Sequence, residues 1–191
     1  QEIRNVAFRG TLNDAIYTAS ENNLLRSALK IDGPKSAAFQ QMQDAEYVLR
    51  FLTLRESWED FSGSLSKSMD EFMLQNRNIL GKDLDNIIQP FKGAVGRTAQ
   101  LWGDVAFQRW DGERWRQQAL AGLYDAEMIA SSLLSDKQVK SAAARHGDLV
   151  EATKHLFADS DFEEAVRLGT NTPSRIKLRI EKVRDMLLNI A

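Results

Sequence analysis

Arginine and tryptophan side chains gather in one irregular stretch of the sequence, between residues 97 and 116. Guanidinium groups pair with phosphates and indole rings stack on bases, so this mixture is typical of surfaces that bind nucleic acid. The residues expected to make such contacts are Arg109, Trp110, Arg114, Trp115 and Arg116. Asp104, Asp111 and Glu113 lie among them. These acids support a second interpretation, in which the arginines pair with them and the tryptophans pin an irregular loop to the core.

A second group of basic residues lies on the last helix that the sequence predicts. Its members are Arg175, Lys177, Arg179, Lys182 and Arg184, with Glu181 and Asp185 between them. Opposite charges three or four residues apart usually form a solvated helix face. We therefore expect these side chains on the outer surface, partly paired with one another.

Motifs for metal binding and for catalysis are weak. The two histidines, His146 and His155, are nine residues apart and lack the spacing of metal ligands. The pair Gly93 and Gly96 is not followed by the Lys-Ser/Thr of a phosphate loop. No cysteine and no Gly-x-Ser-x-Gly motif supplies a nucleophile. We expect no catalytic residue, no metal and no cofactor in this chain, and no enzyme activity of the chain alone.

Composition sets limits on partners and location. The 191 residues include 25 basic and 27 acidic side chains, for a net charge of -2. This balance disfavours general coating of polyanions, so any contact with DNA must be local. The absence of cysteine suits a reducing cytosol, and no apolar run reaches membrane-spanning length. We expect a cytoplasmic protein without a membrane partner, and Gln1 in first place predicts that a segment precedes it.

Helical periodicity extends over most of the chain and must position these residues. Residues 44–78 predict a helical hairpin with Phe51 in the core, and residues 118–134 predict a central helix. Thr172 and Pro173 begin a closing helix, while residues 101–116 predict an ordered loop or small hairpin. The fold class is all-α, a compact irregular bundle of about eight to ten helices. Residues 11–191 are expected to form a single domain and residues 1–10 a junction leading into it.

Several short motifs resemble those of GmrSD-type restriction proteins, which begin with a ParB/sulfiredoxin-like domain. The sequence Gln1-Glu2-Ile3-Arg4-Asn5, followed by Phe8-x-Gly10-x-Leu12-Asn13, is similar to the junction after the nucleotide-hydrolysing domain of that family. The match continues through Glu46-x-Val48-Leu49-Arg50-Phe51, Trp102-Gly103-x-x-Ala106-Phe107 and Thr170-Asn171. The resemblance spans the chain and identifies it with the helical part of the family.

This resemblance implies a function but leaves gaps. The Asp-Gly-Gln-Gln-Arg segment that marks the family's nucleotide-hydrolysing domain does not occur in this sequence, nor does a His-Asn-His-type nuclease domain. By resemblance, Gln1, Glu2, Arg4 and Asn5 border the nucleoside triphosphate pocket of the preceding domain. The other interpretation of these residues is a polar helix that only joins two domains.

Two functions follow from these observations. The first is a helical scaffold that contacts DNA or a partner in a nucleotide-dependent DNA restriction or antiviral defence protein, as the resemblance implies. The second is a structural interaction module that holds a partner subunit or a second copy, as a homodimer, without touching nucleic acid. Clustered free arginines favour the first, and an exposed apolar patch without them favours the second.

Overall fold

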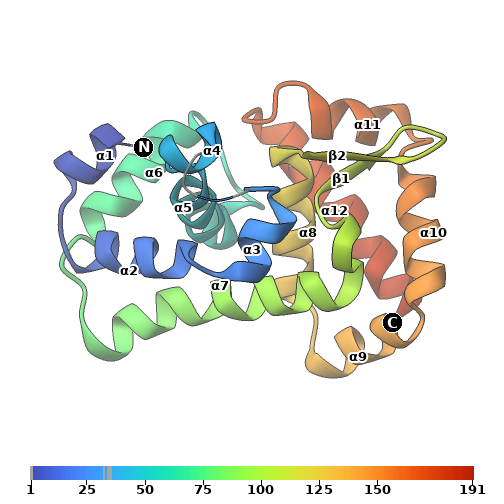
Figure 1. Ribbon diagram of the computed structural model, residues 1–191, viewed down its shortest axis with the longest axis horizontal. Coiled ribbons are helices and arrows are strands. Elements are labelled where there is room, and N and C mark those ends of the chain that lie inside the picture. Colours follow the sequence, from blue (N-terminus) through green and yellow to red (C-terminus); the bar gives the residue numbers. More distant parts are fainter. Residues whose placement is uncertain (1, 32, 34–35) are drawn as a thin grey trace.

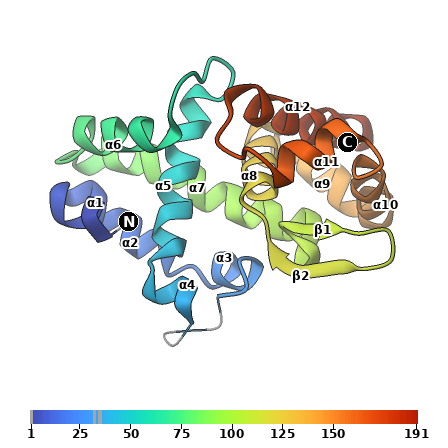
Figure 2. The same ribbon diagram turned by 90° about the horizontal axis from the view of Figure 1, so that it is seen from above.

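The computed structural model describes residues 2–31, 33 and 36–191; for Glu2 and Ile3 it describes the backbone only. Twelve α-helices and one two-stranded hairpin occur among these residues, which confirms the predicted all-α class. The long helix α7 (Gly81–Trp102) runs along the molecule and joins two helical halves (Figures 1 and 2). We call residues 2–80 the N-terminal half and residues 103–191 the C-terminal half.

The N-terminal half is built around α5. Its helices are α1 (Glu2–Ala7), α2 (Thr11–Ser20), α3 (Asn23–Ala28), α4 (Ala37–Gln40), α5 (Gln43–Ser57) and α6 (Leu65–Gln75). The predicted helical hairpin is α5 and α6, and Trp58 and Phe61 are buried in the turn between them. Phe51 is 1% exposed and its ring meets that of Phe91 edge-on at 5.6 Å, which confirms its place in the core.

The C-terminal half surrounds α8. It contains η1 (Gly103–Val105), β1 (Gln108–Trp110), β2 (Trp115–Ala119), α8 (Ala121–Leu133), α9 (Asp136–Ala144), α10 (His146–Leu156), α11 (Ser160–Arg167) and α12 (Pro173–Ile190). Every residue from Gly122 to Ser131 is buried, and α8 packs against α5, α7, α11 and α12. The prediction of a central helix is therefore confirmed.

The start of α8 differs from the sequence prediction. The helix begins at Ala121 rather than at Gln118, because residues 115–119 pair with β1 as an antiparallel strand. Further along α8, a Cβ atom on Gly122 would lie 2.4 Å from the backbone oxygen of Val166. Only glycine permits this close approach of α8 to α11.

The closing helix forms as predicted. Thr172 is its N-cap residue and Pro173 its first residue, although the Thr172 hydroxyl makes no capping hydrogen bond. Ile176, Ile180, Val183 and Leu187 are all buried, and they pack the helix against α8. One assignment on this helix was wrong: Arg179 is not on the outer face but is fully buried.

Candidate functional site

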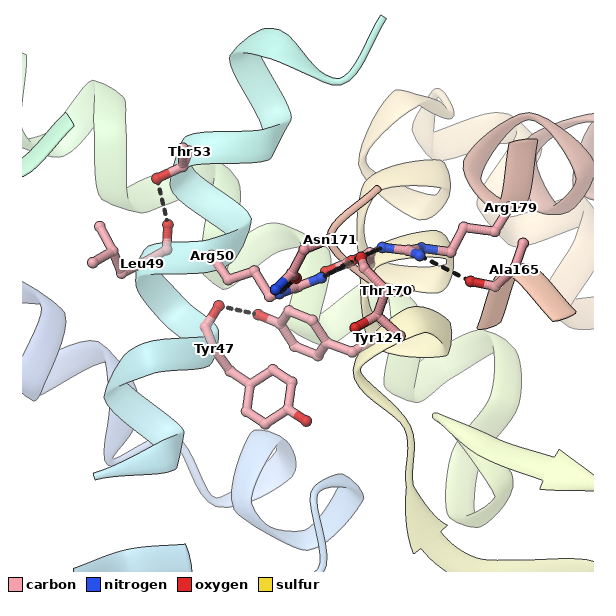
Figure 3. A network of polar contacts seen from close by, with 10 residues as sticks. Tyr47, Leu49, Arg50, Thr53, Tyr124, Ala165, Thr170, Asn171 and Arg179 are labelled. Atoms are coloured by element: carbon pink, nitrogen blue, oxygen red, sulfur yellow. Dashed lines mark hydrogen bonds and ion pairs between the residues drawn. The ribbon is translucent and has the colours of Figure 1, made fainter. Parts of the chain in front are cut away.

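A buried cluster of charged side chains joins the two halves of the molecule. It consists of Arg50 from α5, Asp125 from α8 and Arg179 from α12, and Figure 3 shows the two arginines approaching from opposite sides. Arg50 holds the carboxylate with two hydrogen bonds: its Nε donates to Oδ1 at 2.5 Å and its Nη2 to Oδ2 at 2.6 Å. Arg179 Nη2 donates to the same Oδ2. We refer to these three residues as the central ionic cluster.

Backbone and amide oxygens complete the coordination of the two guanidinium groups. Arg50 Nη1 donates to Asn171 Oδ1 at 2.9 Å, and both arginines donate to the carbonyl of Thr170, at 3.1 and 2.7 Å. Arg179 Nη1 also donates to the carbonyl of Ala165, near the end of α11, at 2.9 Å. Carbonyls at the end of a helix carry partial negative charge, so they help to stabilise the second arginine.

The charges in this cluster do not balance. Two guanidinium groups share one carboxylate, and Arg179 Nε has no acceptor. Burial lowers the pKa of Arg50, but the charge and hydrogen bonds of Asp125 outweigh it and raise the pKa above its ordinary value. For Arg179, burial and the nearby Arg50 outweigh Asp125, so its pKa is lowered. The cluster therefore carries an excess positive charge inside the protein.

Two tyrosines form an aromatic layer beside the cluster. Tyr124 donates its hydroxyl proton to the carbonyl of Tyr47 at 2.8 Å, and the two rings lie 4.6 Å apart between centroids. Burial and the charge of Asp125 raise the pKa of Tyr47 to about 12 and place that of Tyr124 well above its ordinary value. Both phenols thus stay protonated at neutral pH, and Tyr47 also borders a cavity of about 260 Å³ next to Arg50.

Glu127, two residues after Asp125, is buried without a cation. Its side chain accepts a hydrogen bond from the backbone N–H of Phe107 at 2.8 Å, and the residue is 1% exposed. Burial raises its pKa well above the ordinary value, and the hydrogen bond offsets only part of that effect. Glu127 therefore holds its proton more tightly than an exposed glutamate, and it anchors the start of the hairpin to α8.

The residues expected to bind nucleic acid do lie together on the hairpin of β1 and β2. Trp110 pairs with Trp115 across the strands, with ring centroids 5.5 Å apart, and the Trp115 ring lies 6.4 Å from that of Phe157, the residue that follows α10. The ammonium group of Lys154 lies 4.5 Å above the Trp110 ring. Both indoles are only partly exposed, so they contribute to packing of the hairpin on α10.

Two of the three hairpin arginines have acidic partners. Arg109 Nη2 lies 2.6 Å from Glu163 Oε1 of α11, and Arg116 Nε lies 2.5 Å from Asp111 Oδ2 in the turn. Asp111 also accepts the backbone N–H groups of Arg114 and Glu113, and these bonds, with the nearby arginines, lower its pKa. Arg114 is exposed, and no carboxylate among the described residues lies within ion-pair distance of it.

The residues expected at a nucleotide pocket make contacts within this chain. Arg4 Nε lies 2.5 Å from Asp70 Oδ1, and its Nη2 donates to Ser66 Oγ at 2.6 Å, so Arg4 docks α1 on α6. Asn5 donates to the hydroxyl of Tyr17 and lies 2.8 Å from Met42 Sδ. Gln1 lies outside the described residues, as does the side chain of Glu2.

The other basic residues of α12 have partners on several elements, and Lys177 donates to the backbone carbonyl of Glu59 in the turn after α5. Arg175 pairs with Glu164, Lys182 Nζ lies 2.8 Å from Asp159 Oδ2, and Arg184 pairs with Asp185. Within the described part of the chain, no group of three histidine, cysteine or acidic residues could hold a metal ion. The basic side chains of α12 therefore tie this helix to α11 and, through Lys177 and Arg184, to the turn after α5.

The central ionic cluster is the feature that sequence reasoning missed. Arg179 lies three residues after Ile176 and next to Ile180, within the apolar stripe of α12, and this spacing was the available signal.

Comparisons of the chain with protein-family models, with curated proteins and with solved structures gave no match. Among the described helices, none is both long and apolar enough to cross a membrane.

Proposed function

We propose that this chain is a helical scaffold that presents a partner-binding surface, as the helical part of a GmrSD-like, nucleotide-dependent DNA restriction or defence protein. The observation that supports a scaffold most directly is the central ionic cluster, which links three helices from both halves. A buried carboxylate held by two guanidinium groups tolerates little relative movement, because any separation leaves desolvated charges without partners.

The docking of α1 gives this scaffold a fixed entry point. Arg4 and Asn5 attach α1 to α6 and α2, and Gly10 then packs against the carbonyl of Arg77. A domain joined at this end would be held in a defined orientation rather than on a loose linker. This supports the partner in the proposal, a nucleotide-binding domain that precedes α1.

The test of this proposal is nucleotide turnover by the chain alone and with a ParB/sulfiredoxin-like domain fused before residue 1. We expect no hydrolysis of nucleoside triphosphates by the chain alone. In the fusion, Arg4→Ala should lower turnover by loosening α1, and Arg9→Ala, an exposed neighbour, serves as the control. Two results would contradict the proposal. One is nucleotide turnover by the chain alone that is lost when a residue of this chain is mutated. The other is a fusion in which Arg4→Ala leaves turnover unchanged.

A second candidate function is local contact with DNA at the hairpin, and the exposure of Arg114 favours it. Arg109 and Arg116 reach phosphates only by leaving Glu163 and Asp111. Each phosphate contact adds about -0.9 to the slope of log affinity against log salt on duplex DNA. Fluorescence anisotropy over a range of salt should therefore give a shallow slope that Arg114→Ala flattens further. If the parent chain does not bind DNA, the remaining function is that of an interaction module that does not contact nucleic acid.

A further inference from the structure

Met42 differs from the other methionines of the chain in its surroundings. Met69, Met73, Met128 and Met186 are all buried, and none of them is more than 9% exposed. Met42 is partly exposed, and it is the residue at the N-cap of α5. It also lines a cavity of about 330 Å³ whose other walls come from α2, α3, α4 and α5. A small reagent in the solvent can therefore reach Met42 more readily than the other four.

The thioether of Met42 also connects three helices. Its Sδ atom accepts hydrogen bonds from Asn5 Nδ2 of α1 at 2.8 Å and from the Tyr17 hydroxyl of α2 at 3.0 Å. At these distances no space remains between the sulfur and the two donors. Because Met42 begins α5, these contacts attach α1 and α2 to the helix around which the N-terminal half is built. A chemical change at this sulfur therefore acts directly on the docking of α1.

We propose that Met42 is an oxidation site, at which a hydroperoxide converts the thioether to a sulfoxide and thereby loosens α1. In this reaction a lone pair of Sδ attacks one peroxide oxygen, the O–O bond breaks and a sulfur–oxygen bond forms. With hydrogen peroxide, the hydroxyl group now on sulfur passes its proton to the departing hydroxide, which leaves as water. The sulfur is oxidised and the peroxide is reduced by the same electron pair.

The sulfoxide does not fit the contacts that the thioether makes. Its oxygen projects from the side of the sulfur lone pairs, where the donors of Asn5 and Tyr17 lie. Sulfoxidation also makes a flexible apolar side chain polar. The two donors must move outward to make room, so Asn5 loses its place at the start of α5 while Arg4 keeps its contacts with α6. This inference concerns contacts within the chain and does not depend on the proposed scaffold role.

Peptide mass spectrometry of the full chain treated with hydrogen peroxide tests the selectivity. Met42 should gain an oxygen atom at least about tenfold faster than each buried methionine, because susceptibility follows exposure. In urea, where burial is lost, the rates of all the methionines should become similar. A folded chain in which one of the buried methionines reacts as fast as Met42 would overturn the proposal.

Limited proteolysis follows the effect on α1. Docking protects the backbone of α1 from proteases, so oxidation should raise the rate of tryptic cleavage after Arg4 severalfold. Methionine sulfoxide reductases for both epimers should restore the original rate. Met42→Leu keeps an apolar side chain but cannot form a sulfoxide, and peroxide should leave its cleavage rate unchanged. If the oxidised parent is cleaved no faster than the untreated one, or if peroxide accelerates cleavage equally in Met42→Leu, oxidation of Met42 does not control α1.

Discussion

The central ionic cluster and the β1–β2 hairpin both contain arginines paired with acids, but in opposite surroundings. In the cluster, the side chains of Arg179 and Asp125 have no exposed surface, whereas those of Arg109 and Glu163 are 28% and 22% exposed. Both side chains of the hairpin pair keep some exposure, so water partly screens this pair and lowers its contribution to stability. The buried groups have no such replacement. The same residue types therefore hold the fold together in the cluster, whereas on the hairpin the arginines can change partners at lower cost.

The largest effect should follow removal of the only acid in the cluster. Asp125→Asn keeps the shape of the side chain but leaves two buried guanidinium groups without a counter-charge. We expect a loss of about 3 to 5 kcal/mol in the free energy of unfolding, measured with urea. Glu163→Gln, which breaks the pairs of Glu163 with Arg109 and with Arg167, is the control and should cost about 1 kcal/mol or less. Similar losses in the two variants would remove the distinction between the regions.

Removal of the second arginine should cost less than removal of the acid. Arg179→Met leaves Arg50 and Asp125 as a balanced pair with both hydrogen bonds intact. The carbonyls of Ala165 and Thr170 lose a donor, so we expect a loss of about 1 to 3 kcal/mol in urea unfolding. If Arg179→Met lowers the free energy of unfolding as much as Asp125→Asn does, the excess positive charge does not destabilise the folded state.

Glu127 extends the comparison to a buried acid without a cation. Its pKa is raised in the folded state, so the folded protein holds the proton more tightly than the unfolded chain. The contribution of Glu127 to stability is therefore greatest below the ordinary glutamate pKa of 4.5 and falls as the pH rises toward the folded-state pKa. The slope should approach about -1.4 kcal/mol per pH unit. Urea unfolding of Glu127→Gln from pH 5 to 8 should lack this slope, and an unchanged slope would contradict the assignment.

The smallest effect on stability is expected on the hairpin, where DNA binding is the more informative measurement. Replacing Arg109, Arg114 and Arg116 together by alanine should leave the helical circular dichroism spectrum unchanged. If the hairpin contacts duplex DNA, the variant should flatten the salt slope by up to about 2.7, three contacts' worth. A folded variant with the parent's affinity and slope would place any DNA contact elsewhere.

The sequence predicted the helical class and much of the core because apolar spacing determines which face of a helix is buried. Phe51 and the stripe of α12 were found in this way. Which arginines are buried was harder to predict, because the buried Arg179 and the partly exposed Arg184 have the same side chain. Their difference depends on Asp125 and on the carbonyls of Ala165 and Thr170. Those partners lie far away in the chain or belong to the backbone, so local sequence contains little sign of them.

The hairpin shows a related limit. Its acids and arginines were visible in the sequence, and both interpretations of them were open. Arg116 does pair with Asp111 from the same stretch, but Arg109 pairs with Glu163, more than fifty residues away. Only the packing of α11 beside the strands supplies that partner. Sequence thus identified which residues could form ion pairs, and the fold determined which pairs form.

A double-mutant cycle between Arg50 and Asp125 tests the role of the central ionic cluster most directly. Urea unfolding of Arg50→Met, Asp125→Asn and the double variant gives their coupling energy, with Arg109→Met and Glu163→Gln as the matched cycle on the hairpin. We predict a coupling of about 2 kcal/mol or more in the cluster. On the hairpin it should be about 0.2 to 1 kcal/mol. Equal coupling energies in the two cycles would contradict the conclusion that this cluster holds the two halves together.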